Sequence, residues 1–160
     1  MKVIVNDANI LMDLIKVDLL DSFFELNLNM HTTDLVINEC NENQKEILNK
    51  FIESGKMQLE TFNDYRELTM LMENHPQISL ADSSVLLVAK SLKGILLTGD
   101  KCLTKISGKF EIDTHGIFWV FDLLLEQGII ENKLYNDKLK ELRDKNKRLP
   151  REEFEKRINN

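Results

Sequence analysis

The sequence predicts an α/β fold with a central, mostly parallel sheet flanked by helices. Two short apolar runs, at residues 3–5 and 95–97, each end in polar residues, which is typical of buried parallel strands. Between them, apolar residues recur at helical spacing, and strands that alternate with helices build parallel sheets. At 160 residues the chain is long enough for one domain with a hydrophobic core.

Strands and helices are expected to alternate in the first half of the chain. The expected strands are residues 3–5, 30–32 and 57–62, and the expected helices are residues 8–28, 34–39, 47–52 and 64–74. Asp18 is predicted to cap the second of two helices within residues 8–28, and Asp34 to cap the helix that it begins. Gly55 ends the third helical stretch, because glycine readily takes the left-handed conformation found at helix ends.

The second half continues the alternation and then becomes helical. The expected strands are residues 95–97 and 110–112, and the expected helices are residues 80–92, 117–127, 132–147 and 151–158. Ser79 precedes the first of these helices and Gly94 follows it, which are usual positions for these residues at helix ends. We expect a main domain at residues 1–130 and a helical extension of the same domain at residues 131–160.

Composition predicts a cytoplasmic protein without a membrane partner. The apolar fraction of 42% and the charged fraction of 30% are ordinary for a soluble protein. Asp7 follows an apolar run of only three residues, too short for a signal peptide, and no run approaches the roughly 18 residues that span a bilayer. Cys40 and Cys102 are too few for a disulfide framework or a four-ligand zinc site, which indicates a reducing compartment.

Charge is distributed unevenly along the chain. The net charge of −6 argues against a plain nucleic-acid binder. Residues 1–130 hold 11 Lys and Arg against 20 Asp and Glu, whereas residues 131–160 hold 10 against 7. An acidic body with a basic tail suits a cation site beside a segment that contacts phosphate or a partner; a solvated charged helix is the alternative. The tail also has an imperfect apolar stripe, from which we expect it to help association: Leu134, Leu139 and Leu142.

Four acidic residues occupy positions at which carboxylates can converge. Asp7 and Asp100 each follow a strand and precede a helix, and ligands bind at this end of an open parallel sheet. Glu39 and Asp82 lie in helices that are otherwise rich in apolar residues. Carboxylates that share a cleft repel one another unless a cation neutralises them, and hard divalent cations take oxygen ligands.

Each acid also has an ordinary structural explanation, which stays open. Asp7 suits a helix N-cap, and Asp82 suits the first turn of a helix. Glu39 could be one of the many glutamates on helix surfaces. Three further acids are expected to be cap or surface residues: Asp13, Asp34 and Asp64.

The order of the four acids resembles the PIN-domain family. Residues 5–9 (VNDAN) resemble its opening motif, Glu39 matches its second acid, residues 80–84 (LADSS) match its third motif, and residues 96–103 (LLTGDKCL) resemble its fourth. The motifs cover about residues 1–113. The resemblance implies a three-layer PIN-like fold, with a catalytic domain at residues 1–130 and a C-terminal helical extension.

The resemblance also implies an activity, a cofactor and partners. The activity is metal-dependent endonucleolytic cleavage of single-stranded RNA, often by the toxin of a toxin–antitoxin pair. Its catalytic residues, which would hold Mg²⁺ or Mn²⁺ directly or through water, are Asp7, Glu39, Asp82 and Asp100. The residues that would orient these carboxylates by hydrogen bonds are Asn9 and Thr98. The implied partners are an RNA substrate, an antitoxin protein and, in a homodimer, a second copy of the chain.

Two other functions stay open. Cys102 stands where many family members place another Asp, and a thiol is a poor ligand for a hard cation. This departure and the negative charge allow a PIN scaffold that binds RNA or protein with little or no nuclease activity. A phosphotransfer enzyme or receiver fits less well, because the haloacid dehalogenase type needs an Asp at the position of Asn9.

Overall fold

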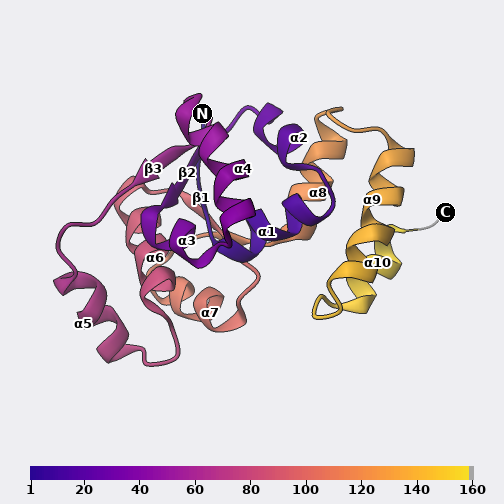
Figure 1. Cartoon of the computed structure of the whole chain (residues 1–160). Coiled ribbons are helices and arrows are strands. Elements are labelled where there is room, and N and C mark those ends of the chain that lie inside the picture. Colours follow the sequence, from indigo (N-terminus) through magenta and orange to yellow (C-terminus); the bar gives the residue numbers. More distant parts are fainter. Residues whose placement is uncertain (159–160) are drawn as a thin grey trace.

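The computed structural model describes residues 1–158, in which five parallel strands form one sheet (Figure 1). The strands are β1 (Val3–Asn6), β2 (Asn29–Thr33), β3 (Gln58–Glu60), β4 (Ile95–Leu97) and β5 (Thr114–His115). The helices are α1 (Ala8–Lys16), α2 (Leu20–Glu25), α3 (Asp34–Glu39), α4 (Glu42–Glu53), α5 (Arg66–Asn74), α6 (Leu80–Leu92), α7 (Lys101–Lys109), α8 (Ile117–Glu126), α9 (Asn132–Lys145) and α10 (Arg151–Arg157). Figure 1 shows α5 at one end of the molecule and the α9–α10 pair at the other.

The strand order is β3-β2-β1-β4-β5, so strands are added in one direction from β1 to β3 and in the opposite direction from β4 to β5. The boundary between β1 and β4 is the reversal point of the sheet. Val5 pairs with His31 of β2 on one side and with Leu96 of β4 on the other. Right-handed crossovers that travel in opposite directions place their helices on opposite faces of the sheet. The predicted parallel α/β fold with three layers is confirmed. In such sheets ligands bind outside the carboxyl ends of the strands at the reversal point.

Helix α6 packs against β1, β2 and β4, which explains its apolar sequence. Val85, Leu86 and Ala89 are fully buried, as are Ile4 and Leu96 in the strands beneath them. A crossover helix runs back against the strand direction, so α6 begins at the carboxyl edge of the sheet. Its first turn therefore lies at the edge where β1, β2 and β4 end.

The prediction of a strand at residues 110–112 is wrong. Phe110 is the C-cap of α7, and Glu111 has a φ of 58°, which a strand does not accept. The Ile112 N–H donates to the Ser107 carbonyl, so the chain folds back over the end of the helix. Residues 110–112 have an apolar–polar–apolar pattern because this turn buries Ile112. The strand lies further along the chain, at β5.

Two predicted caps are also wrong. Asp18 takes a left-handed conformation with a φ of 55° in the turn between α1 and α2, where Leu19 holds the N-cap position. Asp34 is the first residue of α3, and the cap is Thr33, whose hydroxyl accepts from the Val36 N–H at 3.1 Å.

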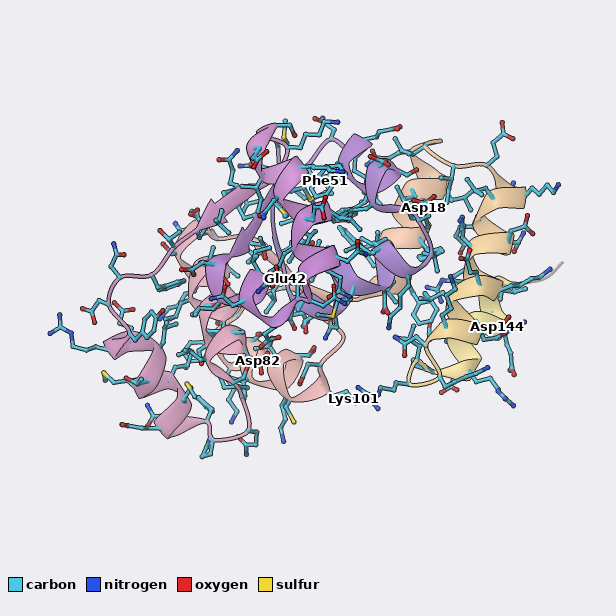
Figure 2. All side chains as sticks on the ribbon, viewed as in Figure 1. Asp18, Glu42, Phe51, Asp82, Lys101 and Asp144 are labelled. Atoms are coloured by element: carbon cyan, nitrogen blue, oxygen red, sulfur yellow. The ribbon has the colours of Figure 1, made fainter. Side chains whose placement is uncertain are left out.

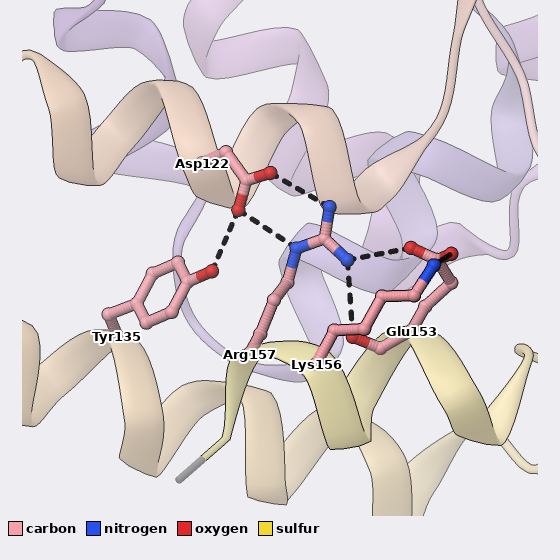
Figure 3. A network of polar contacts seen from close by, with 5 residues as sticks. All are labelled: Asp122, Tyr135, Glu153, Lys156 and Arg157. Atoms are coloured by element: carbon pink, nitrogen blue, oxygen red, sulfur yellow. Dashed lines mark hydrogen bonds and ion pairs between the residues drawn. The ribbon is translucent and has the colours of Figure 1, made fainter. Parts of the chain in front are cut away.

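The C-terminal helices are fastened to α8 by a polar network (Figure 3). The Arg157 Nε and Nη2 atoms donate to the two Asp122 oxygens at 2.9 and 2.8 Å, and Nη1 donates to Glu153 Oε2 at 2.7 Å. The Tyr135 hydroxyl donates to Asp122 at 2.7 Å. Burial and then the contact with Asp122 raise the pKa of Tyr135. One carboxylate thus joins α8, α9 and α10.

The apolar stripe of the tail lies mostly inside the chain. Leu139 and Leu142 are fully buried, and Leu134 is 40% exposed. Two of the three leucines are therefore occupied by the protein's own core, and association through the tail stays a prediction. In residues 1–158, no helix combines the length and apolarity needed to cross a membrane.

Candidate active site

Asp7 follows β1 and caps α1. Its Oδ1 atom accepts from the Ala8 N–H at 2.8 Å, and its Oδ2 atom accepts from the Thr98 hydroxyl at 2.7 Å. The side chain is only 4% exposed. Burial raises the pKa of Asp7 to about 6, against the Thr98 hydrogen bond, and the charges of Asp82 and Glu39 add to the rise.

Thr98 links Asp7 to the second strand-end acid. Its hydroxyl donates to Asp7 and accepts from the Asp100 N–H at 3.1 Å. Asp100 in turn caps α7, because its Oδ1 atom accepts from the Leu103 N–H at 2.9 Å. Thr98 therefore fixes the relative positions of the two acids that follow β1 and β4.

Asn9 holds the turn between β4 and α7 from the other side. Its Oδ1 atom accepts from the Gly99 N–H at 3.1 Å. The structure thus gives Asn9 and Thr98 hydrogen bonds to the same turn, although Asn9 bonds its backbone and no carboxylate.

Asp82 lies in the first turn of α6 and completes a capping box with Ser79. The Asp82 Oδ2 atom accepts from the Ser79 N–H at 2.9 Å, and the Ser79 hydroxyl accepts from the Asp82 N–H at 3.1 Å. The Ser84 and Thr33 hydroxyls lie 2.7 Å apart and tie this turn to the end of β2. Burial raises the pKa of Asp82, and the charge of Asp100 raises it further.

Glu39 is the last residue of α3, the short helix that follows β2. The residue is exposed, yet partial desolvation of its carboxyl group raises its pKa, and the charge of Asp82 adds to the rise. Asp82 therefore acts on both Asp7 and Glu39, and Asp100 acts on Asp82. The four predicted acids, called the acid set below, therefore lie near enough to one another at the carboxyl edge of the sheet for their charges to interact, with Asp82 between the others.

Carboxylate oxygens are the ligands that hard divalent cations take, so the acid set fits such a cation chemically. Its side chains are spread out and are not gathered around one point. Within residues 1–158, no three His, Cys, Asp or Glu side chains lie closely enough to form a ready-made metal site. Three of the acids accept hydrogen bonds from backbone N–H groups at helix starts, Asp7 and Asp100 as N-caps and Asp82 within a capping box. In that part of the chain, Asp82 Oδ1, Asp100 Oδ2 and both Glu39 oxygens accept no hydrogen bond. These oxygens are available to a cation, which would relieve the repulsion that adds to the effect of burial on the pKa values.

The other candidate residues have varied positions. Cys102 is exposed at the second residue of α7 and contributes no oxygen. Asp64 is exposed and binds Arg66, as a surface acid should. The prediction for Asp13 is wrong: it lies buried within α1, and Asn146 donates to both of its oxygens.

Several polar residues at the strand ends were not predicted from the sequence to belong to the site. Asn6 is fully buried and donates to the His31 carbonyl at 3.1 Å, and the Thr32 hydroxyl donates to the Asn6 carbonyl at 2.9 Å. Two sequence features could have indicated them: the adjacent threonines in β2 and the paired serines in the apolar helix α6. Polar residues inside apolar segments need hydrogen-bond partners.

A doubly wound parallel sheet with acids at its reversal point is the architecture of a PIN-like protein. The chain matches the family model DUF3368, described as a PIN domain, over residues 3–160, and it belongs to that family. The match includes the C-terminal helices, beyond the motifs at residues 1–113. PIN domains are generally nucleases and typically use divalent metals.

A solved structure has the same fold. A PilT N-terminus domain protein from the hyperthermophilic archaeon Sulfolobus solfataricus P2 superposes with a TM-score of 0.50 at 14% identity, covering 78% of this chain and 94% of that one. At this identity the likeness concerns the fold alone. A comparison with curated protein sequences gives no significant match.

Proposed function

We propose that the protein is a metal-dependent endoribonuclease that hydrolyses phosphodiester bonds in single-stranded RNA. The supporting observation is the coupled acid set at the reversal point of the sheet, where Asp82 interacts with Asp7 and Glu39 and is itself influenced by Asp100. Membership of a family that generally consists of nucleases supports the reaction class.

The acid set would hold Mg²⁺ or Mn²⁺, which when bound polarises a phosphate and lowers the pKa of a water molecule. The protein's own residues keep this set in place. Thr98 orients Asp7 and Asp100, and the Ser79–Asp82 capping box fixes the start of α6. Because burial raises the pKa of Asp7 to about 6, its carboxyl is partly protonated near that pH when no cation is bound. A toxin role, with an antitoxin partner or a homodimer, is a finer proposal that only the family resemblance supports.

The second candidate is a PIN scaffold that binds RNA or protein with feeble cleavage. The specific observation in its favour is that residues 1–158 contain no ready-made group of metal ligands, together with the exposed thiol of Cys102. Both functions place ligands at the same edge of the sheet, so a cleavage assay separates them.

The test is cleavage of an end-labelled single-stranded RNA with Mg²⁺, with Mn²⁺ and with EDTA. We expect cleavage that needs the metal and falls by roughly 100-fold or more in the Asp7→Asn, Asp100→Asn double variant. The Asp21→Asn, Asp137→Asn double variant removes two exposed acids elsewhere and should cleave normally. Cleavage that persists in EDTA or in the first variant would remove the metal mechanism, and binding without cleavage by the wild type would favour the scaffold.

A further inference from the structure

A cleft of about 1030 Å³ separates one edge of the acid set from the C-terminal extension. Asn9 of α1 and Asp100 and Lys101 at the start of α7 line one side. The other side is formed by Lys145 at the end of α9 and by the turn between α9 and α10, residues 146–150. Figure 2 shows Lys101 projecting from α7 toward this turn. The extension thus forms a wall of the space that leads to Asp100.

The charges of this cleft are mainly positive on the side of the extension. Lys147 and Arg148 are exposed in the turn, and Lys101 is exposed opposite them. Within residues 1–158, none of these three side chains has an acidic partner, whereas Lys145 is paired with Glu141. Three exposed cations therefore line the cleft that Asp100 also lines, in a protein whose net charge is −6.

The turn that carries Lys147 and Arg148 is held against α1 by a partly buried contact. The Asn146 Nδ2 atom lies 3.0 and 3.1 Å from the two oxygens of buried Asp13. The Asn146 Oδ1 atom accepts from the Arg148 N–H at 3.1 Å, so the same side chain shapes the turn. The Lys145 ammonium also donates to the Lys16 carbonyl at 2.8 Å. The turn has a defined place beside the acid set, and its cations are presented by fixed backbone.

We propose that Lys101, Lys147 and Arg148, the basic wall, bind the phosphate backbone of single-stranded RNA and lead it to the acid set at Asp100. This inference rests on the proposed function, since it assigns the substrate's path to the same site. An acid set repels a polyanion, so a substrate needs cations close by to remain bound. Phosphate contacts supply most of the affinity for nucleic acid and little sequence preference. An acid of the proposed site, Asp100, lines the same cleft, which favours RNA over an acidic protein partner.

The test is the binding of a fluorescein-labelled 12-nucleotide oligouridylate to the full chain, measured by anisotropy in EDTA so that no cleavage occurs. We expect the Lys147→Gln, Arg148→Gln double variant to bind roughly 10–30-fold more weakly at 0.1 M salt. The slope of log affinity against log salt should fall by about 1.4, because each lost single-strand phosphate contact contributes about 0.7. The matched control is the Lys133→Gln, Lys140→Gln double variant, which removes two exposed lysines of α9 outside the cleft.

Three other outcomes would overturn the proposal that the basic wall binds RNA. Equal weakening in the two double variants would indicate general charge attraction, and no binding by the wild type would remove the RNA path. Equal or tighter binding of a poly-glutamate of the same charge would assign the wall to an acidic protein. Failure of the proposed function is recognised separately: a wild type that binds RNA through the wall but cleaves no phosphodiester with Mn²⁺ keeps this inference and loses the nuclease.

Discussion

Asp7 combines two demands that oppose each other at a single residue. It is almost fully buried, which disfavours its charged form, yet both of its oxygens accept hydrogen bonds that favour the charge. Burial is the larger effect, and the pKa rises to about 6. Asp82 is more solvated, and only one of its oxygens is bonded within residues 1–158. Replacing Asp7 by Asn therefore disturbs a hydrogen bond, whereas replacing Asp82 by Asn removes little besides charge.

The raised pKa of Asp7 predicts how stability depends on pH in the absence of metal. The ordinary value is 3.8 and the folded value is about 6, so the folded state holds the proton more tightly. The stabilisation is therefore present at low pH and is lost as pH rises from about 4 to above 6. A shift of this size corresponds to roughly 3 kcal/mol.

Urea unfolding in EDTA from pH 4 to pH 7 checks this expectation. The free energy of unfolding of the wild type should fall across this range relative to that of the Asp7→Asn variant, whose side chain does not titrate. A difference between the two proteins that stays constant with pH would show that the Asp7 carboxyl titrates normally.

At the scale of elements, Lys93 ends α6 in a left-handed conformation with a φ of 53°. Such a conformation costs a side chain with a Cβ about 1–2 kcal/mol, and glycine avoids that cost. Since glycine also loses more backbone freedom on folding, we expect Lys93→Gly to stabilise by a net ~0.5–1 kcal/mol. The expected rise in melting temperature is about 1–4 °C. The Lys93→Ala variant loses the same side chain but keeps the Cβ, so it should show no gain. Equal melting temperatures for the two variants would contradict the argument.

Sequence patterns predicted those elements whose burial makes their sequences clearly apolar. β1 and β4 are short apolar runs, and α6 is apolar enough to pack on three strands, so each was placed closely. Two of the errors, at Asp18 and Glu111, fall where the backbone leaves the ordinary regions. Both residues have positive φ values, and a Glu gives no sign of such a backbone in the sequence, whereas Gly or Asn would. The turn at Glu111 was mistaken for a strand for this reason.

The candidate site was predicted only in part, for a similar reason. Asp7, Asp82 and Asp100 lie at recognisable strand ends and helix starts, so their positions are visible in the chain, whereas Glu39, at the end of α3, was placed by the family resemblance. The contacts that hold them are between distant residues, such as Thr33 with Ser84 and Asp13 with Asn146. Such pairs have no local pattern and emerge only when the elements pack together.

For the whole molecule, the extension and the body share a core. Leu139, Leu142 and Phe154 are buried, and the Asp122–Arg157 pair joins α8 to α10. Removing the chain beyond Gly128 would expose the surfaces of the body that these side chains cover, so it would disturb the fold as well as any association through the tail. The acidic body and the basic extension meet at the cleft beside Asp100, and binding of a cation should change the balance of charge there.

Cation binding should therefore stabilise the whole molecule through the acid set. A ligand that binds only the folded state adds about 2.7 kcal/mol at one hundred times its dissociation constant. In EDTA, Asp82→Asn should be more stable than the wild type by ~0.5–2 kcal/mol, because it removes the charge that acts on Asp7 and Glu39 while its amide oxygen can still accept from Ser79. With Mn²⁺, the wild type should gain much more than this variant.

Thermal melts in EDTA, in Mn²⁺ and in NaCl of equal ionic strength measure both effects. About 1 kcal/mol should move the melting temperature of a domain of this size by roughly 2–4 °C. The Asp137→Asn variant, which changes an exposed acid of α9, should follow the wild type in all three solutions. If Asp82 serves only as a cap, Asp82→Asn should not raise the melting temperature in EDTA, and Mn²⁺ should shift all three proteins equally. That result would remove the acid set as a cation site, since linkage requires a ligand that loses affinity when one of its carboxylates is neutralised.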